Sequence, residues 1–151
     1  MTAPPTERIV SLDPGRHTGV CFYEAGRLNP YTAVWDHEKL YQFLIESEPK
    51  VIVYERFDYR PHQPMVDLFP IELIGVIQLY GLHTQCKLVP QPQLKGHGGF
   101  WTDEKLRTLE LYRTGEGGHS NDAIRQLLYY ITFDLCNPYY VEKFGGVTAS
   151  F

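Results

Sequence analysis

The stretch Ile9-Val10-Ser11-Leu12-Asp13-Pro14-Gly15, with Thr18-Gly19 close behind it, decides the fold of this chain. Its first five residues are strand-like, Pro14-Gly15 is a turn signal, and a second β-rich run begins at Thr18, so a hairpin is predicted. Asp13 closes the first strand, where its carboxylate can project toward a cation, and the flanking glycines would let a phosphate approach. The alternative is that Asp13-Pro14-Gly15 is only a β-turn.

The composition is that of one ordinary globular domain. The chain has 151 residues, of which 43% are hydrophobic and 21% charged, and no apolar run is long enough to span a membrane. We therefore expect a single domain over residues 1–151, with 1–7 and 138–151 as fraying tails. Because the start has neither a basic nor an apolar targeting segment, a cytoplasmic location is expected, with no membrane partner.

The charge and the cysteines exclude several classes of protein. A net charge of -4 argues against indiscriminate polyanion binding, although a carboxylate-lined metal site with a few local Arg and Lys remains compatible with nucleic acid. Cys21, Cys86 and Cys136 are widely spaced in apolar contexts. This pattern predicts buried thiols rather than disulfides or a zinc site.

The rest of the chain alternates between strand and helix patterns. After the hairpin we predict three further strands, at Tyr31–Trp35, Val51–Glu55 and Thr84–Val89. Helices are predicted between and after them: one capped by Asp36 and running to Ser47, one from Ile71 to Leu82, one capped by Thr102, and a last one near His119. The chain is therefore α/β in class.

Val51-Ile52-Val53-Tyr54-Glu55 is an unbroken apolar run that ends on an acid, as the first strand does. Such runs are typical of strands covered on both faces. If the two strands are parallel neighbours, Asp13 and Glu55 emerge at the carboxyl edge of the sheet, where ligands bind in open α/β folds.

His119 and Asp122 stand at the start of the last helix. Three residues apart, they adjoin on a helix and lie away from its apolar stripe, which is formed by Ile124, Leu127, Leu128, Ile131 and Leu135. They are therefore available to a ligand. The alternative is helix capping, in which Ser120 or Asn121 caps and Asp122 only complements the helix dipole.

Asp13, Glu55, His119 and Asp122 together form the inventory of a two-cation site. Magnesium prefers oxygen ligands, manganese also tolerates an imidazole, and two such ions can clamp a phosphodiester for in-line displacement. The chain contains no nucleophile elbow, no zinc-protease motif, no phosphate-binding Walker loop and no dinucleotide-binding glycine motif.

Three motifs of this chain occur in a telling order: Ile9-Val10-Ser11-Leu12-Asp13-Pro14-Gly15 with Thr18-Gly19, then Val51-Ile52-Val53-Tyr54-Glu55, then His119-Ser120-Asn121-Asp122-Ala123. In this order they resemble the motifs of RuvC-type Holliday junction resolvases, which belong to the RNase H-like superfamily. The resemblance runs from about Arg8 to Leu135. It implies an RNase H-like fold, in which a mixed five-stranded sheet of three antiparallel and then two parallel strands is flanked by helices. It also implies a homodimer that cuts symmetrically related strands of a four-way DNA junction.

The resemblance assigns roles by position. Asp13, Glu55 and Asp122 match the family's catalytic, metal-binding acids, and His119 matches a site that is acidic in some members and histidine in others. Two Mg²⁺ ions per site are implied, with Mn²⁺ as a substitute. A chain of this size is compatible with a phage-encoded resolvase as much as with a bacterial one, and the sequence names no helicase partner.

The resemblance also suggests where DNA and a second subunit bind. DNA contacts are expected from Arg56, Phe57, Tyr59 and Arg60, which follow Glu55, and from Lys95. The alternative for this loop is a solvated connection. The helix from Ile71 to Leu82 is apolar nearly all round and resembles the family's dimer helix, although a wholly internal helix has the same pattern.

Three rival functions remain. One is another RNase H-like nuclease, such as a YqgF-type ribosomal RNA processing enzyme, acting on structured RNA or branched DNA. A second is a phosphate-binding module of the actin-like ATPases, which needs two such domains. A third, a non-catalytic DNA-binding protein, is disfavoured because grouped acids facing a phosphate backbone are costly without cations.

Overall fold

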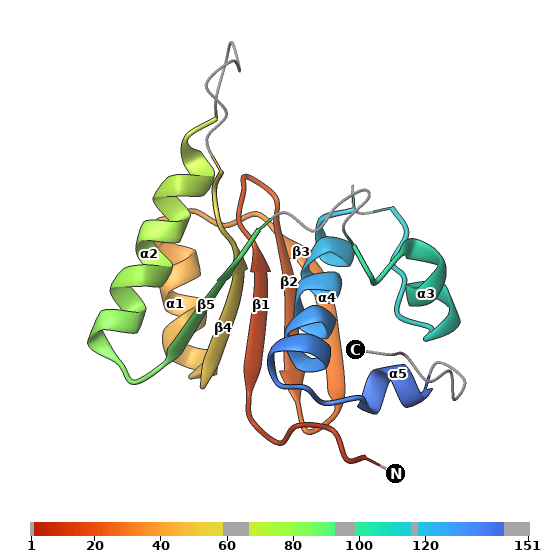
Figure 1. Cartoon of the computed structure of the whole chain (residues 1–151). Helices are drawn as coiled ribbons and strands as arrows, with labels where there is room; N and C mark the ends of the chain where they lie inside the picture. Colours follow the sequence, from red (N-terminus) through yellow and green to blue (C-terminus); the bar gives the residue numbers. More distant parts are fainter. Residues whose placement is uncertain (1, 59–66, 93–98, 116–117, 144–151) are drawn as a thin grey trace.

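The computed structural model describes residues 2–58, 67–92, 99–115 and 118–143 (Figure 1). Its centre is a five-stranded sheet in the order β3-β2-β1-β4-β5. The strands are β1 (Ile9–Asp13), β2 (Thr18–Glu24), β3 (Arg27–Ala33), β4 (Val51–Glu55) and β5 (Lys87–Gln91). β1, β2 and β3 pair antiparallel, whereas β4 is parallel to both β1 and β5. The predicted RNase H-like mixed sheet is therefore confirmed.

Helices cover both faces of the sheet, as Figure 1 shows. One face carries α1 (His37–Ser47) and α2 (Phe69–His83), which also pack against each other. The other face carries α4 (His119–Tyr129) over β1 and β2, continued by the π-helical turn η2 (Tyr130–Asp134). The short helices α3 (Asp103–Thr108) and α5 (Tyr139–Lys143) lie on this second side.

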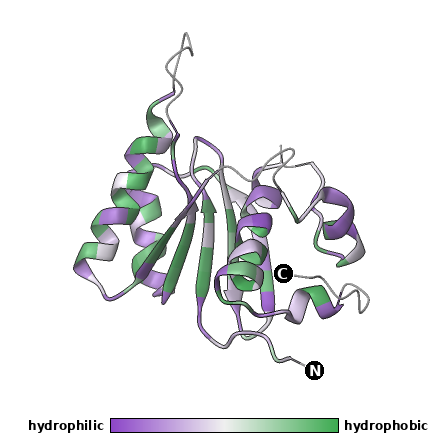
Figure 2. Ribbon diagram, in the orientation of Figure 1, coloured by the Kyte–Doolittle hydropathy of each residue, from purple (hydrophilic) through white to green (hydrophobic). Residues whose placement is uncertain are grey.

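The inner strands β1, β2 and β4 are largely hydrophobic (Figure 2), and core clusters lie on both sides of the sheet. In β1, Val10 and Leu12 belong to the cluster under α1 and α2, while Ile9 belongs to the cluster under α4. Side chains alternate along a strand, and β4 follows the same alternation. This alternation puts Asp13 and Glu55 on the α4 side of the sheet.

The caps of two helices agree with the sequence. Asp36 accepts a hydrogen bond from the backbone nitrogen of Lys39 at 2.8 Å, and Thr102 accepts one from that of Lys105 at 3.3 Å. These side chains satisfy amides that a helix leaves without a partner at its start.

The start of α4 does not match the alternative in which Ser120 or Asn121 caps this helix. The residue before it is Gly118, with φ 83°, and Ser120 and Asn121 lie inside its first turn, so neither of them caps it. The Asn121 side chain instead accepts from the backbone nitrogen of Arg113 and donates to its carbonyl, both at 2.8 Å. It therefore ties the chain before α4 to the start of this helix.

The two edge strands lie elsewhere than predicted. β3 covers Arg27–Ala33 rather than 31–35, and β5 covers Lys87–Gln91 rather than 84–89. Each contains a proline, Pro30 or Pro90, which lacks the amide that a central strand needs. An edge strand tolerates proline because one of its sides has no partner strand.

Some details near the last helices, and the cysteines, were not anticipated. Residues 139–143, within the segment expected to fray, form α5, whose Tyr140 and Val141 are buried. Leu135 is 37% exposed rather than part of the apolar stripe, because the π-helical turn of η2 changes the spacing. Only Cys21 of the three free cysteines is buried; Cys86 is half-buried and Cys136 is exposed.

No helix in the part of the chain that the structure describes is long and apolar enough to cross a membrane.

Candidate active site

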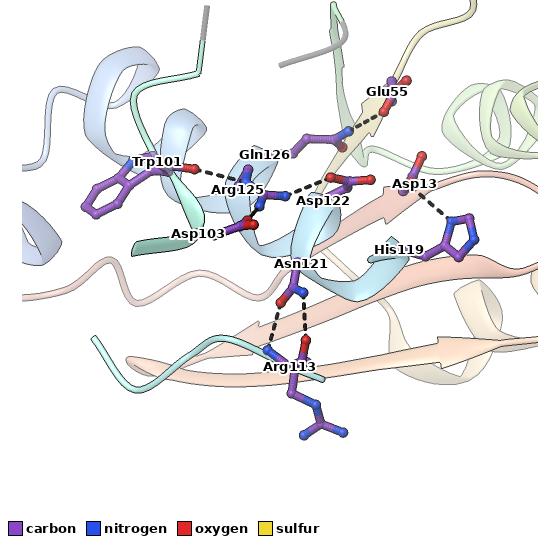
Figure 3. A network of polar contacts seen from close by, with 10 residues as sticks. All are labelled: Asp13, Glu55, Trp101, Asp103, Arg113, His119, Asn121, Asp122, Arg125 and Gln126. Atoms are coloured by element: carbon purple, nitrogen blue, oxygen red, sulfur yellow. Dashed lines mark hydrogen bonds and ion pairs between the residues drawn. The ribbon is translucent and has the colours of Figure 1, made fainter. Parts of the chain in front are cut away.

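Two neighbouring strands deliver the first two acids to one edge of the sheet. β1 and β4 are parallel, and their register pairs Leu12 with Tyr54, so Asp13 and Glu55 come one residue further along each strand. Both side chains lie at the edge drawn in Figure 3. Asp13 is only 8% exposed, which is unusual for a carboxylate unless it has partners. The predicted parallel pairing is confirmed.

α4 brings the other two predicted residues to this edge. His119, Asp122 and Gln126 occupy positions i, i+3 and i+7, which share one face of a helix. Asp122 is 6% exposed. Helix and sheet approach closely because β2 has Gly19 at the contact: a Cβ there would collide with the backbone carbonyl of His119.

The His119 imidazole lies beside Asp13. Its Nδ1 is 3.6 Å from Asp13 Oδ2, so a protonated ring would form an ion pair with this carboxylate. The ring of His17 stacks on it, with centroids 6.1 Å apart and an angle of 23° between the planes. The turn between β1 and β2 therefore helps to orient His119.

Asp122 is held by a guanidinium from its own helix. Arg125 Nη1 donates to Asp122 Oδ1 at 2.8 Å, and Arg125 also donates to the carbonyl of Trp101 at 3.0 Å and pairs with Asp103. Burial lowers the pKa of Arg125, but two carboxylates favour its charged form, and arginine stays protonated in proteins. Sequence reasoning missed this residue; its spacing of three from Asp122 was the available signal.

Glu55 is held by a second residue that sequence reasoning missed. Gln126 Nε2 donates to Glu55 Oε2 at 3.1 Å (Figure 3). Gln126 is 1% exposed and follows Asp122 by four residues on the same face of α4. A polar residue on the same helix face as His119 and Asp122 was the signal in the sequence.

The donor set has the right chemistry for a hard divalent cation, since it offers three carboxylates and one imidazole. Within residues 2–58, 67–92, 99–115 and 118–143, however, no three His, Cys, Asp or Glu side chains are arranged to hold one metal ion. Protein groups contact each of these acids: His119 lies beside Asp13, Arg125 donates to Asp122 and Gln126 donates to Glu55. Binding one ion by several of these side chains would therefore require them to move closer together than they lie here.

The residues predicted to contact DNA are only partly described. Arg56 is exposed, and its Nε lies 2.9 Å from Asp58 Oδ1. Phe57 is half-buried and packs against the core under α1 and α2. Tyr59, Arg60 and Lys95 lie outside the described residues.

A further exposed cation lies near this edge. Arg16, in the turn after Asp13, lies over the ring of Phe69 at 5.1 Å from its centroid, and its Nε is 3.4 Å from Asp67 Oδ2. Its place directly after the Asp13-Pro14-Gly15 motif was the signal in the sequence.

Comparison with known proteins identifies the fold. No protein-family model and no curated protein sequence matches the chain. Among solved structures, Thermus thermophilus RuvC is 15% identical with a TM-score of 0.58, covering 86% of this chain and 97% of that one. T. thermophilus RuvC in complex with Holliday junction substrate is 12% identical with a TM-score of 0.63, and the match covers 93% of this chain and 97% of that one. The fowlpox virus Holliday junction resolvase is 12% identical with a TM-score of 0.52, and the match covers 82% of this chain and 97% of that one. This chain therefore has the fold of the RuvC-type Holliday junction resolvases.

Proposed function

We propose that this chain is a metal-dependent endonuclease that resolves four-way DNA junctions by paired, symmetric nicks. One observation carries the proposal: Asp13, Glu55, His119 and Asp122 gather at one edge of a sheet whose fold is that of RuvC-type resolvases. One of the similar structures is a RuvC in complex with Holliday junction substrate, which supports branched DNA as the ligand. Such an enzyme would work in the cytoplasm of a bacterial or phage-infected cell.

The four residues would hold two Mg²⁺ ions, for which Mn²⁺ would substitute. The ions would supply an activated water and stabilise the leaving oxygen of a phosphodiester. The protein's own part is to hold the carboxylates in place: Arg125 donates to Asp122, and Gln126 donates to Glu55.

Affinity for DNA would come from cations rather than from the acids. Arg16 and Arg56 are exposed, and each follows one of the acids closely, so a phosphate backbone that reaches the acids would also meet these cations. Arg60 and Lys95 would extend this basic set, and Phe57 and Tyr59 would contact bases.

The active unit would be a homodimer joined through α2. A four-way junction has paired strands to cut, and a two-fold dimer supplies two identical sites. α2 buries one face, while its Leu79 and Leu82 are 48% and 82% exposed and Ile71 is also exposed. Exposed apolar side chains on one helix are typical of a surface that a partner covers.

The proposal is tested by a panel of substrates. Purified protein is incubated with a synthetic four-way junction, a flap, a plain duplex and a structured RNA, each with Mg²⁺, Mn²⁺ or a chelator, and the cut strands are mapped. We expect paired nicks in the junction, only with a divalent ion. Preferred cleavage of the RNA would favour a YqgF-type nuclease, and no cleavage of any substrate would contradict a nuclease.

A further inference from the structure

Gln126 reaches Glu55 from a distant part of the sequence. Its Nε2 donates to Glu55 Oε2 at 3.1 Å across a separation of 71 residues, which joins α4 to the end of β4. Gln126 is 1% exposed and Glu55 is half-buried, so this bond is partly shielded from water. Inside a protein a hydrogen bond to a carboxylate is stronger and more directional than at the surface.

The amide is retained at a cost to stability. Gln126 Oε1 is buried and has no hydrogen-bond partner among the described residues. A buried polar atom without a partner destabilises the folded state, whereas a methionine of similar size would fill the same space without that penalty. The glutamine therefore has a use other than packing, and the hydrogen bond that its side chain makes within the described part of the chain is to a candidate metal ligand.

A donor on one oxygen of a carboxylate fixes the plane of the group. It thereby fixes the direction in which the other oxygen can bind a cation, and it removes rotamers that binding would otherwise have to select. The same arrangement occurs at Asp122, whose Oδ1 accepts from Arg125 Nη1 at 2.8 Å. Two successive residues of α4 thus each donate to one of the candidate metal-binding acids.

We propose that Gln126 is a positioning residue that orients the Glu55 carboxylate for a divalent cation. The inference rests on the metal site of the proposed function, but not on the identity of the nucleic acid. Arg125 is less suited to a test, because it also bonds to Trp101 and Asp103 and its removal would disturb the start of α3.

The test measures Mn²⁺ binding to the full chain by calorimetry, without DNA. The variant Gln126→Met keeps the volume and removes the donor, and we expect Mn²⁺ affinity to fall 10- to 100-fold, since mutations of such outer groups typically have this effect. The kcat for junction cleavage should fall similarly, while KM for the junction and the melting temperature should not worsen. Gln126→Asn, which withdraws the amide by one methylene, should weaken Mn²⁺ binding as well.

A matched control exists on α1. Gln42 Nε2 donates to Glu46 Oε1 at 2.8 Å on the exposed surface, so Gln42→Met removes the same kind of bond away from the site and should change nothing. Unchanged Mn²⁺ affinity in folded Gln126→Met would overturn the inference, and so would failure of both Gln126 variants to fold, which would make the residue structural. Wild-type protein that binds no Mn²⁺, or binding that Glu55→Gln leaves intact, would instead overturn the metal site and the inference with it.

Discussion

Gly19 determines how deeply the start of α4 sits on the sheet. A Cβ at this position would meet the carbonyl carbon and oxygen of His119, which are backbone atoms and cannot turn aside as a side chain would. Since α4 carries His119, Asp122 and Gln126, this single glycine governs the distance between the helix residues and the acids of β1 and β4.

Gly19→Ala should therefore lower the free energy of unfolding by about 3 kcal/mol, the upper end of the usual cost of overpacking, and lower cleavage with it. Urea unfolding measures the first effect. Gly15→Ala, in the same hairpin, is the control, because its Cβ would be 3.4 Å from the His17 carbonyl, an ordinary contact. Wild-type stability of Gly19→Ala would show that α4 is not seated as described.

The three cysteines should react with a thiol reagent in the order of their exposure. Cys136 is exposed and should react first. Burial raises the pKa of Cys86 to about 11, so little thiolate is present at pH 8 and its reaction should be slow. Cys21 is fully buried, which raises its pKa further, and it should react only on unfolding. Mass spectrometry of labelled peptides checks the order; rapid labelling of Cys21 in folded protein would contradict the burial of β2.

At the scale of elements, the sequence predicted the bounds of a strand best where the strand's own residues and its place in the sheet favour the same conformation. β1 and β4 lie in the middle of the sheet, and their apolar runs matched the structure residue by residue. β3 and β5 were displaced because Pro30 and Pro90 argue locally against a strand, and only their place at the edges makes proline acceptable.

The sequence predicted those residues of the candidate site that local patterns identify, but not those that depend on contacts between distant segments. Asp13 and Glu55 end strands, and strand ends can be read from local patterns. Gln126 could not be assigned to Glu55, because their contact depends on how α4 lies across the sheet. The partial packing of Phe57 on the core under α1 and α2 was likewise not predictable, because it is a long-range contact that its neighbours in sequence do not specify.

If α2 joins two subunits, a charge on its outer face should separate them. Leu82 is 82% exposed, so Leu82→Glu should leave the fold intact while burying a carboxylate in the interface, which is costly. We expect the dimer dissociation constant to rise at least about tenfold by analytical ultracentrifugation. Ile45→Glu on α1, also at an exposed apolar position, is the control. Monomeric wild-type protein at high concentration would contradict a dimer altogether.

At the scale of the whole molecule, an acidic protein is proposed to bind a polyanion. The net charge is -4, so attraction to DNA must come from the local arrangement of cations rather than from the total. Each phosphate contact releases counterions, which makes the logarithm of affinity fall with the logarithm of salt concentration.

Arg56→Ala should accordingly weaken junction binding and reduce this salt slope by about 1. Arg60→Ala should act in the same direction. Fluorescence anisotropy over a range of salt concentrations, with chelator to prevent cleavage, gives the slope. Arg27→Ala is the control, because Arg27 begins β3 at the end of the sheet opposite to the one that carries Asp13 and Glu55. An unchanged slope in Arg56→Ala would remove the segment after β4 from the path of the DNA.

The central claim is that the acids at one sheet edge perform metal-dependent cleavage. Its most direct test compares Asp13→Asn, Glu55→Gln and Asp122→Asn with wild type, measuring junction cleavage in Mg²⁺ and junction binding in chelator on the same preparations. Each variant should lose cleavage and keep binding, because the acids serve the ions while arginine and lysine supply most of the affinity. Cleavage near the wild-type rate in any one of the three would contradict the account.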